Sequence, residues 1–263
     1  MKLARILGVS VLALSLLAGS ALAQNHWPKS APTPEQIKEF ISQIESGRIT
    51  KESLAKFLDG NRIAGYESAR RILGDDFISP SDVATAHRVS YTKDQLDYFV
   101  KTLPEESVLR WAKENGYAVV AGPPTPTSLL DTRSLNPKLF WTQSGGWYDN
   151  ENFARNDKAA TNWLIIRKEP VPNSTNKNWN EQLQLLSKDE QVPNSGEIGW
   201  FITTFYEVRG VRLFERIYVR TSSVASVGGR VGVGGFDGDG LVVGSYWDGG
   251  RGYGLGVAAS RKF

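Results

Sequence analysis

The stretch "FITTFYEVRGVRLFERIYVR", from Phe201 to Arg220, has the pattern of two antiparallel strands joined by a tight turn. β-branched and aromatic residues dominate both halves of the stretch. The pair Arg209-Gly210 separates the halves by two residues, which is typical of a two-residue β-hairpin loop. The sequence therefore predicts that residues 200–219 form the central hairpin of an antiparallel sheet.

The register counted outward from this loop gives the hairpin two different faces. We assign the more apolar face to the core, with Trp200, Ile202, Tyr206, Leu213, Ile217 and Val219 as its members. The other face alternates arginines with rings, because Phe201 lies opposite Tyr218 and near Arg216 and Arg220. A slip of one residue would exchange the two faces.

Three interpretations of this arginine-aromatic face are open. Its ion pairs and ring contacts are those of an ordinary cross-strand ladder. The same residues could line a groove in which Arg216 and Arg220 bind an anionic or sugar-like ligand that stacks on Phe201 and Tyr218. The face could also bind a protein partner.

Glu215 falls among apolar residues on the inward face of the predicted hairpin. A buried carboxylate needs a partner or a raised pKa. One interpretation pairs Glu215 with Thr204 and with an arginine from elsewhere in the chain. A catalytic acid and an incorrect register are the two alternatives.

The chain before residue 122 has helical periodicity. Thr33-Pro34-Glu35-Gln36 and Thr92-x-x-Gln95 are capping-box patterns, and further helices are expected over residues 50–58, 66–73 and 104–115. "YAVVAG" then indicates a strand, and "GPPTPT" (122–127) indicates a linker, because successive X-Pro bonds favour extended backbone.

Beyond the linker the composition changes. Thirteen of the 26 glycines fall between Gly228 and Gly256, and "FDGDGL" and "WDGGRG" are typical of hairpin turns. "NWLIIRK" indicates a strand, and Asn178-x-x-Glu181 a short helix. We therefore expect an α+β fold with a helical region over 33–121 and an antiparallel, β-rich, sandwich-like domain over 128–263. Residues 254–263 are expected to pair inside this sheet.

The first 23 residues resemble a secretory signal peptide. Lys2 and Arg5 precede an apolar run of about 13 residues, and Ala21-Leu22-Ala23 ends it as an A-x-A cleavage site. The run is shorter than the roughly 20 residues that span a bilayer. We expect cleavage after Ala23, a polar leader over 24–32, and a periplasmic or secreted mature protein with no transmembrane segment.

Charge and cysteine content restrict the function further. The chain has 31 Lys and Arg against 28 Asp and Glu, so removal of Lys2 and Arg5 leaves 29 against 28. A protein this close to neutral lacks the broad basic field that nucleic acids require, so no nucleic-acid partner is expected. The absence of cysteine excludes disulfides and thiol catalysis.

Recognisable catalytic and metal motifs are few. His26 and His87 are the two histidines, and neither has metal-ligand spacing, so no metal and no cofactor is expected. Asp237-Gly238-Asp239-Gly240 begins like a calcium loop, but Leu241 and Val242 occupy positions that such a loop gives to a ligand and a glycine. A turn is the better interpretation.

A hydrolase that uses two carboxylates is compatible with the sequence, with Asp149, Glu151, Glu207 and Glu215 as candidates. "WTQSGGWYDNENF" (141–153) supplies rings, including Trp147 and Tyr148, that could stack on a sugar or could anchor a loop. The ligand-binding candidates are therefore Phe201, Tyr218, Arg216, Arg220, Trp147 and Tyr148.

The phrases "GPPTPTSLLDTRSL" and "VRGVRLFERIYVRTSS" are long and specific. With them the chain resembles a group of uncharacterised bacterial proteins that share these phrases over most of the sequence after about Ser79. This resemblance implies no activity, ligand or site residue. Two functions are therefore expected: a noncatalytic envelope or secreted protein that binds a glycan or a protein, and, as the alternative, a hydrolase of envelope or extracellular polymer.

Overall fold

The computed structural model describes residues 32–50, 54 and 65–261. The predicted signal peptide, nearly all of the predicted leader, His26 and most of the predicted helix over 50–58 lie outside these residues. The chain divides into two compact units, Met1–Asp59 and Gly60–Phe263. In the first unit, α2 (Pro34–Glu45) begins with the predicted capping box, in which Thr33 and Gln36 satisfy each other's backbone N–H groups.

The second unit is a mixed α+β fold, which confirms the predicted class. Residues 65–73 are helical. The other helices are η2 (Gly74–Asp76), α4 (Pro80–His87), α5 (Lys93–Lys101), α6 (Glu106–Glu114), α7 (Leu129–Leu135), η3 (Pro137–Leu139), α8 (Asn152–Asn156), α9 (Trp179–Leu183) and α10 (Ser195–Arg209). The strands are β1 (Phe77–Ile78), β2 (Tyr117–Ala121), β3 (Thr127–Ser128), β4 (Lys158–Ala159), β5 (Trp163–Arg167), β6 (Glu190–Gln191), β7 (Tyr218–Val224), β8 (Arg230–Asp237), β9 (Gly240–Tyr246), β10 (Leu255–Val257) and β11 (Ser260–Arg261).

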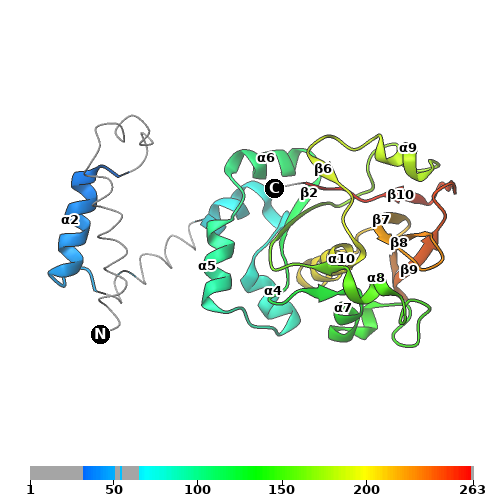
Figure 1. Cartoon of the computed structure of the whole chain (residues 1–263), viewed down its shortest axis with the longest axis horizontal. Helices are drawn as coiled ribbons and strands as arrows, with labels where there is room; N and C mark the ends of the chain where they lie inside the picture. The colour runs from blue at the N-terminus through cyan, green and yellow to red at the C-terminus, as the bar shows by residue number, and fades with distance from the viewer. Residues whose placement is uncertain (1–31, 51–53, 55–64, 262–263) are drawn as a thin grey trace. The chain divides into compact units, whose positions relative to one another are not determined.

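These strands form two main sheets and one short pair. The larger sheet has the order β1-β2-β5-β11-β6, and the four-stranded sheet has the order β10-β7-β8-β9. β2 and β5 pair antiparallel along their whole lengths, whereas β1 is parallel to β2 and β10 is parallel to β7. Figure 1 shows α10 between the two sheets, and α10 contacts β2 and β5 on one side and β7 and β8 on the other.

The predicted hairpin over 200–219 is wrong, because its first half is helix α10. Asn194 and Glu197 form a capping box at the start of this helix, and Gly210 ends it in the left-handed conformation with φ 69°. Gly210 is therefore a helix cap, not the second residue of a two-residue turn. The chain then turns through residues 211–217 before it enters β7.

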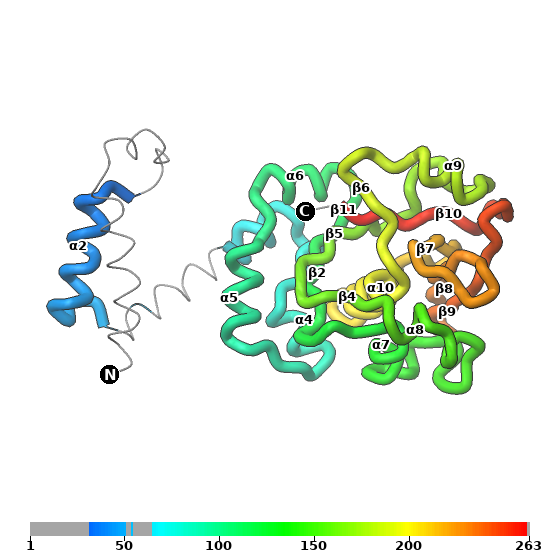
Figure 2. The backbone as a smooth tube through the Cα atoms, viewed as in Figure 1, coloured from blue at the N-terminus to red at the C-terminus, as the bar shows by residue number. Residues whose placement is uncertain are grey.

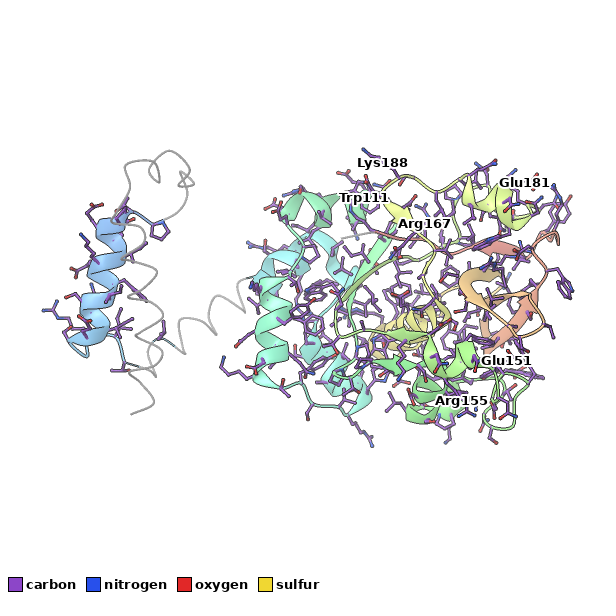
Figure 3. The ribbon with its side chains drawn as sticks, viewed as in Figure 1. Trp111, Glu151, Arg155, Arg167, Glu181 and Lys188 are labelled. Atoms are coloured by element: carbon purple, nitrogen blue, oxygen red, sulfur yellow. The ribbon has the colours of Figure 1, made fainter. Side chains whose placement is uncertain are left out.

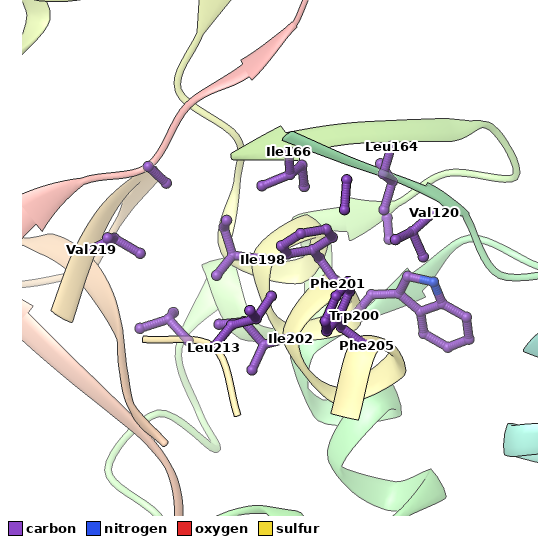
Figure 4. Packing of buried hydrophobic residues seen from close by; sticks show 14 of the residues in the cluster. Val120, Leu164, Ile166, Ile198, Trp200, Phe201, Ile202, Phe205, Leu213 and Val219 are labelled. Atoms are coloured by element: carbon purple, nitrogen blue, oxygen red, sulfur yellow. The ribbon is translucent and has the colours of Figure 1, made fainter. Parts of the chain in front are cut away.

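α10 is buried on nearly all sides. All its residues from Ser195 to Phe205 except Glu197 are buried, so the predicted core residues Trp200 and Ile202 are buried, but so is Phe201 from the opposite predicted face. Figure 4 shows Ile198, Phe201 and Ile202 between Val219 of β7 and Val120 of β2. A helix that is apolar all round has no polar stripe, so its sequence shows no helical periodicity.

The residues that were predicted as a linker lie inside the second unit. Residues 122–127 connect β2 to β3, and strands from both sides of this segment share one sheet. The Tyr91 hydroxyl donates a hydrogen bond to the Gly122 carbonyl at 2.6 Å, which fixes the segment to the helical part. Extended X-Pro backbone thus forms a connection within one core here, and it does not separate two domains.

The C-terminal segment joins both sheets, as its red trace shows in Figure 2. β10 pairs with β7 in the four-stranded sheet, and β11 inserts between β5 and β6 in the larger sheet. Val257 at the end of β10 and Ala258 and Ala259 between the two strands are fully buried. The expected pairing of this segment inside a sheet is confirmed, although it is divided between two sheets.

None of the helices that the structure describes combines the length and the apolar character that crossing a bilayer requires.

Candidate functional site

An open pocket of about 960 Å³ lies where η2, the end of α6, the end of β5 and the segment after α10 meet. We call it the basic pocket. Its lining residues are Gly74, Asp75, Asp76, Lys113, Gly116, Arg167, Lys168, Glu169, Phe205, Val208, Arg209, Val211, Arg212, Leu213 and Phe214. The lining has five cationic side chains against three carboxylates, an excess of two positive charges.

Two left-handed glycines position the walls of the basic pocket. Gly116 ends α6 with φ 74° and turns the chain into β2, and its carbonyl accepts a hydrogen bond from the Lys168 backbone N–H at 3.0 Å. Gly210 ends α10 and directs the chain into the wall formed by residues 211–214. Both positions favour glycine because a left-handed backbone costs other residues about 1–2 kcal/mol.

Asp76 forms ion pairs with both lysines of the basic pocket. Its carboxylate is 6 % exposed and lies 2.6 Å from the Lys168 ammonium and 3.2 Å from the Lys113 ammonium. Partly buried pairs of this kind are screened less by salt than surface pairs. One carboxylate balances only one of the two lysines, so the lysines and the arginines share the excess positive charge of the pocket.

Arg167 stands at the end of β5, on the same side of the molecule as Trp111 of α6 (Figure 3). One of its Nη atoms donates to the Asn115 carbonyl at 2.7 Å, and its guanidinium lies 5.7 Å from the Tyr117 ring centroid. Its Nε–H is buried and has no acceptor among the described residues. Arg167 therefore retains a hydrogen-bond donor that the protein does not satisfy.

Arg212 lies against two rings. Its guanidinium is 4.4 Å from the Tyr206 ring centroid and 4.6 Å from that of Phe236, distances typical of cation–π contacts. One Nη atom donates to the Tyr206 hydroxyl at 3.3 Å, and the other is buried without an acceptor in the described part of the chain. The two rings hold the cation in place without neutralising it.

Arg209 has a different role from the other two arginines. It donates to the carbonyls of Asp75 at 2.9 Å and Phe77 at 2.7 Å. These bonds attach the end of α10 to η2 and β1. We regard Arg209 as a structural residue and Arg167 and Arg212 as the anion-binding residues of the basic pocket.

The structure separates the residues that were predicted as one ligand-binding face. Phe201 is fully buried in α10, Arg216 is exposed in the turn before β7, and Tyr218 is partly buried in β7. Tyr218 packs against Tyr246 with 5.9 Å between ring centroids. The predicted groove required the hairpin, so it is lost with it.

Arg220 is fully buried in β7 and acts as a clamp. It donates to the carbonyls of Lys177, Trp247 and Gly250 and to the Gln182 side chain, at 2.8 to 3.2 Å. These bonds attach α9 and the turn after β9 to the four-stranded sheet. A groove with an exposed Arg220 is therefore contradicted.

Trp147 and Tyr148 anchor a loop. The Trp147 indole donates to the Val243 carbonyl at 2.9 Å, which covers part of the free edge of β9, while the ring remains 46 % exposed. Tyr148 is buried, and the Arg133 guanidinium lies 4.9 Å from its ring centroid. Neither residue lines the basic pocket.

Glu215 differs from its sequence interpretation, and His87 lies against α10. Glu215 is exposed in the turn before β7, so its predicted burial is wrong. His87 is stacked on Trp200 at 4.6 Å between ring centroids and shares a 2.8 Å hydrogen bond with the Thr204 hydroxyl. Burial lowers the pKa of His87 to about 4.

A second polar cluster, which the sequence interpretation missed, lies at the start of α10. The Ser223 hydroxyl donates to Asp157 and lies 3.0 Å from the Ser195 hydroxyl. Burial raises the pKa of the Glu197 carboxyl, and the charge of Asp157 raises it further, against the Asn194 backbone N–H, which lowers it. The Asn194-x-x-Glu197 spacing is a capping-box pattern that could have revealed this helix start.

In the described residues, no group of three or more His, Cys, Asp or Glu side chains could hold a metal ion. Compared with known protein families, curated proteins and solved structures, the chain matches none of them.

Proposed function

We propose that the protein is an exported, noncatalytic binding protein whose ligand is anionic and occupies the basic pocket. The observation that supports this proposal most is the pair Arg167 and Arg212. Each is a permanent cation that lines the pocket and keeps a buried N–H group without an acceptor among the described residues. A buried donor without an acceptor costs about 1–3 kcal/mol.

An oxyanion in the basic pocket would bind the guanidinium groups that line it. Guanidinium groups form charge-assisted hydrogen bonds with carboxylate and phosphate oxygens, which are about twice as strong as neutral ones. The volume of the pocket lies within the range of small-molecule sites, about 300–1,000 Å³.

Isothermal titration of the full chain with inorganic phosphate and with acetate tests the anionic ligand. We expect binding that weakens with ionic strength and falls about tenfold or more in Arg212→Gln. Arg216→Gln is the matched control, because it removes the same charge from an exposed turn outside the basic pocket. Equal affinities in the two variants, or no anion binding at all, would contradict the proposal.

Export is the second part of the proposal, and its support is the three-part pattern over Met1–Ala23. Mass spectrometry of the protein recovered from its bacterial host should give a chain that begins at Gln24. An intact Met1 in the cytoplasmic fraction would contradict export.

A hydrolase is the second candidate function, and the pair Glu197 and Asp157 favours it. A carboxyl with a raised pKa beside a second carboxylate is the arrangement of a general acid and its partner. Glu197 also belongs to the capping box of α10, and Asp157 accepts a hydrogen bond from Ser223, so both groups have structural roles as well. Release of product from bacterial envelope polysaccharide by the parent chain, but not by Glu197→Gln, would favour the hydrolase over the binding protein.

A further inference from the structure

The basic pocket has two chemically different walls. The charged wall comes from η2, the end of α6 and the end of β5, and it includes Arg167. The second wall comes from the end of α10 and the segment that follows it, and its apolar members are Phe205, Val208, Val211, Leu213 and Phe214. From this division, and on the basis of the proposed function, we infer that the ligand is a small amphiphilic carboxylic acid. Its carboxylate lies at Arg167 and Arg212, and its apolar chain lies along the second wall.

The apolar wall offers surface that a ligand can cover. Val211 is 50 % exposed and Val208 is partly buried, while Phe205, Leu213 and Phe214 form the buried layer of the same wall. A single exposed valine needs no explanation in a soluble protein. Here Val211 lines a pocket together with the partly buried Val208, so an apolar ligand group would remove the surface of these two valines from water.

The backbone of the apolar wall is strained at Phe214. This residue has φ 54°, a left-handed conformation that is a genuine outlier for an aromatic residue. Such strain costs on the order of 1–3 kcal/mol and persists only where the surroundings fix it. The Phe214 carbonyl accepts hydrogen bonds from the Phe236 and Ile217 backbone N–H groups at 3.3 and 3.4 Å, which hold the wall against β8.

The volume of the basic pocket favours a ligand larger than a simple inorganic anion. A water molecule takes a share of roughly 30 Å³ of liquid, and a phosphate ion is only a few times larger. Either would leave most of the 960 Å³ filled with solvent. An acid with a chain of several carbons would fill more of the pocket and contact both walls.

The positive charge of the basic pocket favours an acid over a neutral amphiphile. Its lining has five cationic side chains against three carboxylates, and the arginines among them carry a charge that does not titrate. A carboxylate supplies two acceptor oxygens and the opposite charge, whereas a primary amide supplies one acceptor and no charge.

Calorimetric titration of the full chain with butyrate, hexanoate, octanoate and octanamide, below micelle-forming concentrations, tests this ligand class. Burial of one CH₂ group is worth about a fourfold change in affinity. We expect octanoate to bind about 20-fold or more tightly than butyrate. Octanamide should bind about tenfold or more weakly than octanoate.

Two pairs of variants locate the two ends of the ligand. Val211→Ser should reduce the advantage of octanoate over butyrate about threefold or more and leave butyrate binding unchanged. Its control is Val224→Ser, at a valine with a similar exposed fraction, 44 %, outside the pocket. Arg212→Gln should weaken both acids, while Arg216→Gln should weaken neither.

Each outcome separates this inference from the proposed function. If butyrate and octanoate bind equally, the pocket binds anions but the amphiphilic ligand is wrong. If octanamide equals octanoate, the carboxylate is not recognised and the inference fails. If no acid and no phosphate binds, both the inference and the proposed function fail. If Val211→Ser and Val224→Ser behave alike, the chain does not lie on the proposed wall.

Discussion

Helix α10 and the β8–β9 hairpin are both rich in apolar residues, yet only the hairpin was predicted correctly. The hairpin has a local signal, because Asp237-Gly238-Asp239-Gly240 forms the turn and Asp237 pairs with Gly240. α10 has no polar stripe, because it is buried against strands on two sides. Alternating apolar residues therefore identify a strand only where one face is exposed, and a fully buried helix shows the same composition.

The largest difference in stability is expected between variants of a tryptophan in α10 and of one beside the β8–β9 hairpin. Trp200 is fully buried, stacks on His87 and donates to the Ala121 carbonyl at 3.1 Å. Trp200→Ala should lower the free energy of unfolding by about 3–5 kcal/mol. Trp247 is 68 % exposed, so Trp247→Ala should change it by about 0.5 kcal/mol or less. Urea unfolding of both variants tests this contrast, and similar midpoints would contradict the buried position of α10.

The next largest difference in stability is expected between variants of Arg220 and Arg216. Arg220→Ala should destabilise the fold by about 3 kcal/mol, because it leaves buried acceptors on α9 and the turn after β9 without their donor. Arg216→Ala should cost less than about 0.5 kcal/mol, since Arg216 is exposed. Thermal melts of the two variants measure the difference. If Arg216→Ala is the more damaging change, the placement of both residues is wrong.

The contact between His87 and α10 predicts a dependence on pH. The pKa of His87 is about 4 in the folded protein and about 6.5 in the unfolded chain, so the unfolded chain binds a proton first as the pH falls. The contribution of His87 to stability is complete above pH 6.5 and is lost progressively towards pH 4, by about 2 kcal/mol at pH 5. In urea unfolding, the free energy of unfolding of His87→Gln should therefore fall by about 2 kcal/mol less between pH 7.5 and pH 5 than that of the parent chain. An identical pH dependence in the variant would contradict it.

The smallest effect concerns the end of α10. Gly210 has φ 69°, so Gly210→Ala should cost about 1 kcal/mol, whereas Gly249→Ala adds a Cβ that meets nothing within 4 Å. Chemical denaturation resolves a difference of this size. Equal stabilities would show that Gly210 is not a left-handed helix cap.

How much could be predicted differs between the fold and the site. Capping boxes at Thr33, Thr92 and Asn178, the strands β2 and β5 and the Asp-Gly turn follow from short-range patterns, and the structure confirms them. α10 has comparable signals in Asn194, Glu197 and Gly210, but its alternating apolar residues are equally typical of a strand. The predicted hairpin therefore placed Arg216, Glu215 and Phe201 on faces of a sheet to which they do not belong.

The basic pocket could not be predicted from one stretch of sequence. Its residues come from four separate parts of the chain: 74–76, 113–116, 167–169 and 205–214. Only the pairing of β2 with β5 and the packing of α10 against them bring these parts together. The two rings that contact Arg212, Tyr206 and Phe236, likewise lie on different elements, α10 and β8.

Arginine side-chain ¹H–¹⁵N NMR of the full chain during titration with octanoate tests the central claim most directly. The account predicts that the side-chain signals of Arg167 and Arg212 shift together and saturate, while those of Arg216 and Arg220 do not move. Saturable shifts confined to other arginines, or no shift at any arginine, would contradict an anionic ligand in the basic pocket.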